Sequence, residues 1–116
     1  MHEMSIANNI FDIAEQSLPE TCPKLLSITV QIGELAGVEL EALSFCFDAV
    51  KKSTPFPDAE LIVERIPGAG MCDACGKELH IDQPFAVCPD CGNYTVRVVG
   101  GQELKVISLE IEEEET

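Results

Sequence analysis

The chain has 116 residues, 46% of them hydrophobic, which suits one domain, or one domain with a small module, and argues against disorder. Its formal net charge of −14 repels nucleic acid and anionic lipid, and it attracts cations and basic protein surfaces. No stretch approaches the roughly 20 apolar residues that span a bilayer, and the N-terminus lacks a secretory pattern, so we expect a cytoplasmic protein with reduced cysteines.

The first two residues supply three nitrogen donors on short covalent paths: the α-amine of Met1, the backbone amide of His2 and the His2 imidazole. One metal ion that bridges all three closes two chelate rings. In-plane nitrogen donors of this kind suit square-planar Ni(II) or Cu(II) better than tetrahedral zinc. The alternative is that His2 is an ordinary solvated residue on a frayed terminus.

The segment from Met4 to Leu18 is predicted to be an amphipathic helix that begins almost at residue 3 and ends before Pro19. A helix beginning there ties the first three residues to a rigid element. The apolar residues at helical spacing are Ile6, Ile10, Ile13 and Ala14.

The following segments predict a second helix and three strands. Apolar and polar residues alternate over 26–32, which is typical of a half-buried strand, and a short turn follows at 34–36. Strands are also expected at 61–66 and 104–111. The second helix carries its apolar face on Leu40, Leu43, Phe47 and Val50.

These elements predict an α+β fold, with two helices packed on a three-stranded sheet. Glycines lie at both ends of the segment 68–101, at Gly68 and Gly70 and at Gly100 and Gly101. We therefore expect an inserted module at 68–101 and a main domain formed by 1–67 and 102–116.

The insert contains two CxxCG motifs, and twelve residues separate the two cysteine pairs. Four thiolates are the ligand set of tetrahedral structural zinc, and a glycine tolerates the sharp turn of a zinc knuckle. An insert of about thirty residues is below the ~40 at which a domain usually needs a metal or disulfide staple. We expect a zinc ribbon, with Cys72, Cys75, Cys88 and Cys91 as the zinc ligands.

Other uses of these cysteines are two disulfides, a rubredoxin-like iron site, or thiol–disulfide exchange. Nothing in the chain indicates the oxidising compartment that disulfides need. Lys77 is the only lysine or arginine between the two pairs, with Arg97 beyond them, so the module lacks the basic cluster of a nucleic-acid-binding ribbon. His80 is expected to be a surface residue, and a transient or outer-sphere metal contact is the alternative.

Two glutamates have both a structural and a functional interpretation, and Cys46 has a structural one alone. Glu39 and Glu41 open the second helix, where carboxylates favour the positive end of the helix dipole. The alternative is that one of them reaches the N-terminus as an oxygen ligand. Cys46 is expected to be a small core residue. We find no catalytic constellation in the sequence, so the protein is not expected to be an enzyme.

Taken in order, the motifs resemble the HypA/HybF family of nickel metallochaperones, which serve [NiFe]-hydrogenase maturation. The resemblance covers essentially the whole chain. It rests on the sequences Met1-His2-Glu3-Met4-Ser5, Ile32-Gly33-Glu34-Leu35-Ala36-Gly37-Val38, Glu41-Ala42-Leu43 with Phe45 and Phe47, the two cysteine pairs, and Leu104-Lys105-Val106-Ile107-Ser108-Leu109-Glu110.

The resemblance implies that Ni(II) binds at Met1, His2 and Glu3 as transient cargo and that structural Zn(II) binds at the four cysteines. Some members place an Asp after the glycine-rich turn that joins the nickel shell, and Glu39 stands at the matching position here. By the same analogy nickel passes to the hydrogenase large subunit with help from a GTPase partner, and some members also serve urease.

Two rival functions remain open at this level. One is a protein-interaction adaptor that docks through its zinc ribbon and delivers no nickel. The other is an electron-transfer iron protein. The sequence is compatible with a monomer and, because glycines flank the insert, with a homodimer that exchanges segments.

Overall fold

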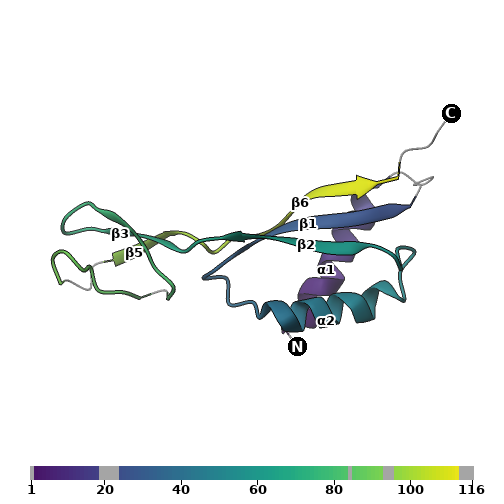
Figure 1. The fold of residues 1–116 in the computed structure, drawn as a ribbon, viewed down its shortest axis with the longest axis horizontal. Helices are drawn as coiled ribbons and strands as arrows, with labels where there is room; N and C mark the ends of the chain where they lie inside the picture. Colours follow the sequence, from purple (N-terminus) through teal and green to yellow (C-terminus); the bar gives the residue numbers. More distant parts are fainter. Residues whose placement is uncertain (1, 19–23, 84, 93–95, 113–116) are drawn as a thin grey trace. The chain divides into compact units, whose positions relative to one another are not determined.

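The computed structural model describes residues 2–18, 24–83, 85–92 and 96–112, so Met1 lies outside the described residues (Figure 1). They form two helices and two three-stranded sheets, with strand orders β2-β1-β6 and β4-β3-β5. The elements are α1 (His2–Ser17), β1 (Leu25–Gly33), α2 (Leu40–Lys51), β2 (Glu60–Ile66), β3 (Ala69–Cys72), β4 (Glu78–His80), β5 (Val96–Gly100) and β6 (Leu104–Ile111).

The predicted α+β fold class is confirmed, and the two helices and three main strands lie within one or two residues of the predicted segments. Along the described chain, no helix is long and apolar enough to cross a membrane.

The chain divides into two compact units. Unit 1 comprises residues 1–30, 38–63 and 106–116, and unit 2 comprises residues 31–37 and 64–105. Each strand of the first sheet therefore begins in one unit and ends in the other. The predicted boundaries of the inserted module, 68 and 101, stay a prediction.

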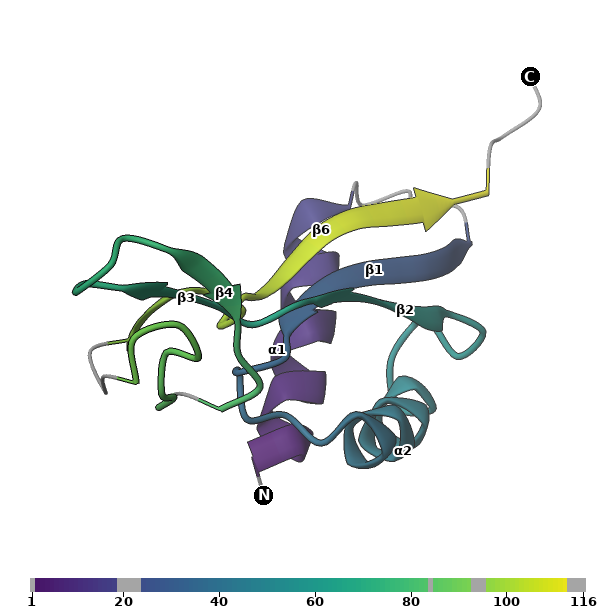
Figure 2. The same ribbon diagram turned by 60° about the vertical axis from the view of Figure 1, so that its left-hand side comes forward.

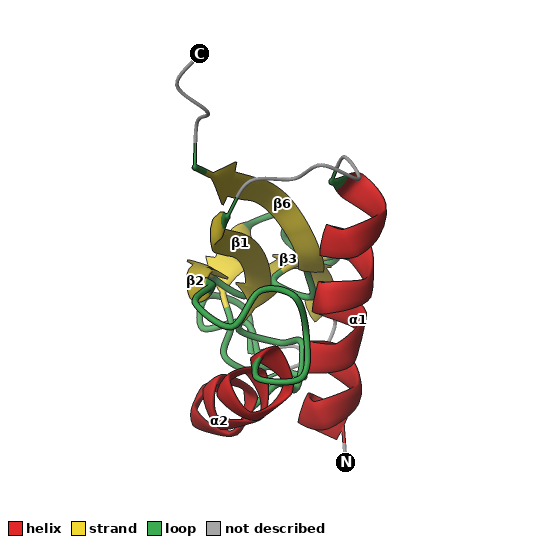
Figure 3. Ribbon diagram, turned by 90° about the vertical axis from the view of Figure 1, so that its right-hand side faces the viewer, coloured by secondary structure: helices red, strands yellow, loops and turns green. Residues whose placement is uncertain are grey.

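Helix α1 packs on the first sheet through one face and against α2 (Figure 3). Its buried residues are Ile6, Ala7, Ile10, Phe11 and Ala14, and the Phe11 ring stacks on Phe47 of α2 with centroids 4.7 Å apart.

The buried face of α1 differs from the prediction at two positions. Ile13 is 44% exposed, whereas Phe11 is buried. At 3.6 residues per turn, the buried face runs from Ile6 round to Phe11, and Ile13 falls just outside its edge. The predicted apolar stripe was therefore rotated about the helix axis toward Ile13 and away from Phe11, relative to the face that is buried.

Strand β1 is the centre of its sheet and is mostly buried. Ile28, Val30 and Ile32 are at most 1% exposed, as the alternation predicts, but the phase breaks at the start of the strand. There Leu25 and Ser27 are buried and Leu26 is half-buried. In α2, Leu43 and Phe47 of the predicted face are buried, whereas Leu40 and Val50 are half-buried. Cys46, which is 1% exposed, is a core residue as expected.

The second sheet gives the cysteine module its strands (Figure 2). Strand β3 pairs antiparallel with both β4 and β5, and a bulge lies between Ala69 and Gly70 in the pairing with β5. Ile81 is buried, whereas Phe85 and Val87 are 75% and 45% exposed. They lie in the loop after β4, outside the strands that could cover them.

Three glycines of unit 2 meet backbone to backbone where the second sheet joins the first. A Cβ at Gly33 would lie 1.9 Å from the Gly101 carbonyl oxygen, and one at Gly101 would lie 2.5 Å from the Gly68 Cα. Gly101 also has a φ of 95°, a conformation that side chains other than glycine rarely adopt. The crossing is therefore closed to any residue with a side chain.

Candidate metal centres

Of the residues predicted to bind nickel, the structure describes His2, Glu3 and Glu39. Helix α1 begins at His2, which is exposed, and Glu3 is half-buried in the first turn. The first four N–H groups of an α-helix have no acceptor within the helix. The His2 amide is one of these, so the helix does not use the nitrogen that a metal would take. Met1, the third predicted contributor, lies outside the described residues.

Glu39 is the N-cap of α2. One of its carboxylate oxygens accepts from the backbone N–H of Glu41 at 3.3 Å, and the other accepts from Ala42 at 3.0 Å. The capping role expected for this residue is confirmed. Both oxygens are thereby engaged on its own helix, and any metal contact has to compete with that cap.

The four cysteines of the two CxxC pairs converge on one point. Their sulfur atoms all lie within 4.8 Å of one another. Cys72 and Cys88, the first of each pair, are buried, and Cys75 and Cys91 are exposed. No disulfide joins the cysteines in the described residues, so the two-disulfide alternative finds no support.

The sulfur spacing fits a tetrahedral metal. The Sγ atoms of Cys72 and Cys91 are 3.5 Å apart, and those of Cys75 and Cys88 are 3.7 Å apart. With a Zn–S bond of about 2.3 Å, neighbouring sulfurs of a tetrahedron are about 3.8 Å apart. The cluster is therefore compatible with structural zinc.

Each pair has the local geometry of a zinc knuckle. The N–H of Gly76 donates to the Cys72 carbonyl at 2.7 Å, and the N–H of Gly92 donates to the Cys88 carbonyl at 2.8 Å. The φ angles of the two glycines are 72° and 71°. The expectation that glycine follows each second cysteine to allow a positive φ is confirmed.

Without a bound cation the Cys75 thiol holds its proton more tightly than an ordinary thiol. The backbone N–H of Lys77 lowers the pKa of the Cys75 thiol, but hydrogen bonds with Cys72 and Cys88 and partial desolvation outweigh it and raise that pKa to about 11. A divalent metal reverses this balance, because a coordinated thiol loses its proton.

Two ion pairs border the cluster. The Lys77 ammonium lies 2.5 Å from a carboxylate oxygen of Asp90, and the Arg97 guanidinium lies 3.3 Å from Asp73. Asp73 and Asp90 are spacer residues inside the first and second CxxC pair. The hydrogen bond and charge of Asp90 raise the pKa of Lys77 above its usual value.

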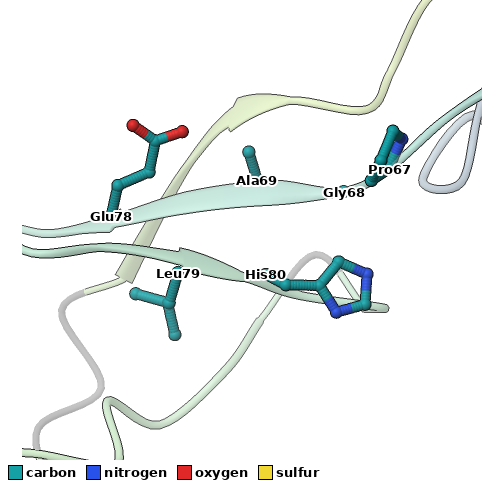
Figure 4. Close-up of a pocket in the computed structure, with 6 residues that line it drawn as sticks. All are labelled: Pro67, Gly68, Ala69, Glu78, Leu79 and His80. Carbon is teal, nitrogen blue, oxygen red and sulfur yellow. The ribbon is translucent and has the colours of Figure 1, made fainter.

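His80 lies on the surface, as expected, and contacts a carboxylate. Its Nε2 is 2.7 Å from Glu34 Oε1, which also accepts from the Gly68 N–H at 3.0 Å. The Gly68 amide and then His80 hold the pKa of Glu34 below its usual value. An open pocket of 440 Å³ adjoins this contact and is lined by Pro67, Gly68, Ala69, Glu78, Leu79 and His80 (Figure 4).

The sequence patterns identified the four cysteines, but they did not predict the side-chain contacts found elsewhere in this module. Glu34 and His80 are 46 residues apart, and Lys77 and Asp90 are 13 residues apart. The available signal was compositional: residues 68–101 contain one lysine and one arginine, and two aspartates lie inside CxxC spacers.

A two-helix α+β body that carries a four-cysteine knuckle module defines a small metal-binding protein. The family model for "Hydrogenase/urease nickel incorporation, metallochaperone, hypA" matches residues 1–111. The chain belongs to this HypA family of hydrogenase maturation factors and nickel metallochaperones.

Curated relatives agree over their full lengths. The chain is 45% identical over 112 residues to the hydrogenase maturation factor HypA of Geobacter metallireducens and 43% identical over 113 residues to that of Chlorobaculum parvum. Each match covers 97% of this chain and 100% of the relative. The solution structure of the nickel metallochaperone HypA from Helicobacter pylori shares the fold, with a TM-score of 0.65 at 21% identity over 97% of this chain and 98% of that one.

Proposed function

We propose that this protein binds Ni(II) as cargo through the Met1 amine, the His2 amide and the His2 imidazole. It then delivers the metal for hydrogenase maturation. Family membership over residues 1–111 supports the role. The observation that carries the site is that α1 begins at His2, which leaves that amide outside the helical hydrogen-bond pattern.

The donor set also explains release. Protons compete with a metal for amine and imidazole nitrogens, so a small fall in pH shifts the balance from metal binding toward metal release. The positive end of the α1 dipole disfavours a cation, and the carboxylate of Glu3 in the first turn offsets that field.

Glu3 and Glu39 complete the proposed nickel shell. Glu3 follows His2 directly and contributes its backbone or its side chain. Glu39 joins the shell only if at least one of its two cap hydrogen bonds with α2 is released. The nickel-bound and nickel-free proteins would then differ in how the N-terminus of α2 is capped.

The second metal in the proposal is zinc, held by Cys72, Cys75, Cys88 and Cys91. Sulfur spacing and knuckle geometry support a structural site with four protein ligands. Such a site leaves no open position for substrate, which supports a protein that carries metal and catalyses no reaction.

The proposed partners are a GTPase of hydrogenase maturation and the hydrogenase large subunit, in the cytoplasm. The net charge of −14 favours partners with basic surfaces and disfavours nucleic acid and anionic membranes. Urease is a second candidate recipient, because the family description includes it.

Nickel titration by calorimetry tests the terminal site. Wild type should bind one Ni(II) per chain, and His2→Ala should abolish that binding because it removes one ring nitrogen of the chelate. His80→Ala is the matched control, since the chain has two histidines and His80 contacts Glu34 instead. If His2→Ala binds nickel as tightly as wild type, the terminal-site proposal is wrong.

Two further variants locate the ligands more closely. One glycine added before Met1 should weaken nickel binding without changing the fold, because it moves the amine out of chelate reach. Glu39→Ala should weaken nickel binding only if its carboxylate is a ligand. The adaptor alternative predicts that wild type binds nickel no better than a scrambled N-terminal peptide.

A further inference from the structure

The lysine and the arginine of the insert each form an ion pair with an aspartate that lies inside a CxxC spacer. Lys77 and Arg97 are the one lysine and the one arginine of 68–101, and the third basic residue, His80, contacts Glu34. Lys77 follows the first knuckle and pairs with Asp90 inside the second, while Arg97 pairs with Asp73 inside the first. The acidic residues Glu78 and Asp82 lie in the same insert, so this one-to-one pairing is not forced by composition.

Lys77 has contacts with both knuckles. Its carbonyl accepts from the Cys72 N–H at 2.9 Å, and its own N–H is hydrogen-bonded to the Cys75 thiol. Its side chain crosses to Asp90, which stands between Cys88 and Cys91. The backbone of Lys77 is thus hydrogen-bonded to both cysteines of the first knuckle, and its ammonium contacts an aspartate of the second knuckle.

We propose that Lys77 and Asp90 form a clamp that fixes the separation of the two knuckles and thereby keeps the four-cysteine cluster selective for zinc. This inference rests on the proposed zinc site. Lys77 and Asp90 are positioning residues that act through the sulfurs without binding the metal.

The reason for such a clamp lies in the cargo. Four sulfurs at the corners of a tetrahedron suit zinc, whereas Ni(II) favours a flat arrangement of ligands. Flattening requires the two knuckles to rotate against each other. A contact that crosses from one knuckle to the other opposes that rotation, and a contact within a single knuckle does not. If the four cysteines could adopt a flat arrangement, they would bind the Ni(II) that the protein carries for delivery.

The test measures zinc release from the purified full-length protein to a colorimetric chelator. Lys77→Gln and Asp90→Asn should each release zinc about two- to fivefold faster than wild type, as expected for an ion pair that is half exposed. Because both remove the same contact, the double variant should be no faster than the faster single variant. Lys77→Arg should stay near the wild-type rate.

A second measurement follows nickel entry. Zinc-loaded protein is incubated with excess Ni(II), and thiolate-to-nickel absorption reports metal at the cysteines. Lys77→Gln should gain this absorption faster than wild type. Lys105→Gln and Asp82→Asn, which change exposed charges of the same signs elsewhere in unit 2, should behave as wild type in both measurements.

The clamp is refuted if both single variants release zinc at the wild-type rate, or if their effects multiply in the double variant. Wild-type protein that carries one zinc per chain together with unchanged variants refutes the clamp alone. Wild-type protein that carries no zinc refutes the proposed zinc site and the clamp together.

Discussion

At the scale of single residues, Glu34 shows how a carboxylate outside both metal centres is fixed in place. It lies in the turn after β1 and accepts from the Gly68 N–H at 3.0 Å and from His80 at 2.7 Å. Its own N–H donates to the Ile66 carbonyl at 2.8 Å. All of these contacts belong to unit 2, so Glu34 ties the short segment 31–37 to the rest of that unit.

The Glu34 contacts give unit 2 a dependence on pH. The Gly68 amide and His80 lower the pKa of Glu34 below 4.5 in the folded protein, so its stabilisation is complete above pH 4.5 and is lost as pH falls through the lowered value. We therefore expect Glu34→Gln to be less stable than wild type at neutral pH, with the difference shrinking in acid below 4.5.

Urea unfolding of both proteins across this pH range measures the difference. Glu60→Gln, at the exposed start of β2, serves as the control carboxylate. A stability difference between wild type and Glu34→Gln that stays constant through the acid range would contradict the assigned hydrogen bonds.

At the scale of elements, the two sheets depend on a crossing that only glycine allows. Gly33 ends β1, Gly68 precedes β3 and Gly101 follows β5, and their backbones approach too closely for a Cβ. The N–H of Leu35 donates to the Gly101 carbonyl at 2.7 Å, which adds a hydrogen bond to the same crossing. The glycines at the ends of the insert are therefore explained by this close backbone contact, and they need not be explained as a flexible linker.

Adjacent glycines provide a matched test of this crossing. A Cβ at Gly101 would lie 2.5 Å from the Gly68 Cα at a φ of 95°, whereas one at Gly100 would lie 3.6 Å from the Ala69 Cβ, an ordinary contact. Gly101→Ala should therefore lower the free energy of unfolding by about 1–3 kcal/mol, and Gly100→Ala should change it much less. Thermal or urea unfolding measures both, and equal effects would refute the crossing.

The long elements were predictable because their signal is local. Spacing of apolar residues locates α1, β1 and α2, and the knuckle motif locates the four sulfurs. The short strands of the second sheet were not assigned, because a strand of three or four residues, such as β3 or β4, carries too few alternations. The Glu34–His80 and Lys77–Asp90 contacts depend on the register of folded segments, which no local pattern encodes.

At the scale of the whole molecule, the two units differ in what stabilises them. Unit 1 contains most of the buried apolar residues, including Phe11, Ile28 and Phe47. In the described part of unit 2 the buried hydrophobic residues are Ile32, Cys72, Ile81 and Cys88, and two of these four are proposed zinc ligands. We therefore expect the stability of unit 2 to depend on a bound metal in a way that the stability of unit 1 does not.

Zinc removal should accordingly unfold one unit and leave the other. A thiolate site contributes on the order of 10–16 kcal/mol of apparent folding free energy in small zinc domains, far more than two buried aliphatic side chains supply. After chelation we expect amide hydrogen exchange to become fast over 69–100, while the buried positions of α1, β1 and α2 keep their protection.

Readdition of zinc should restore the protection of unit 2, and Cys75→Ser should mimic chelation without any chelator present. The result also tests the domain boundaries predicted at 68 and 101. If fast exchange extends to residues 31–37, the cooperative unit includes the turn that Glu34 ties to Gly68. If α1 loses protection at the same zinc concentration as β3, the two units unfold together and zinc stabilises the whole chain. In that case the loss of zinc from the four cysteines destabilises unit 1 through the strands of the first sheet, which run through both units.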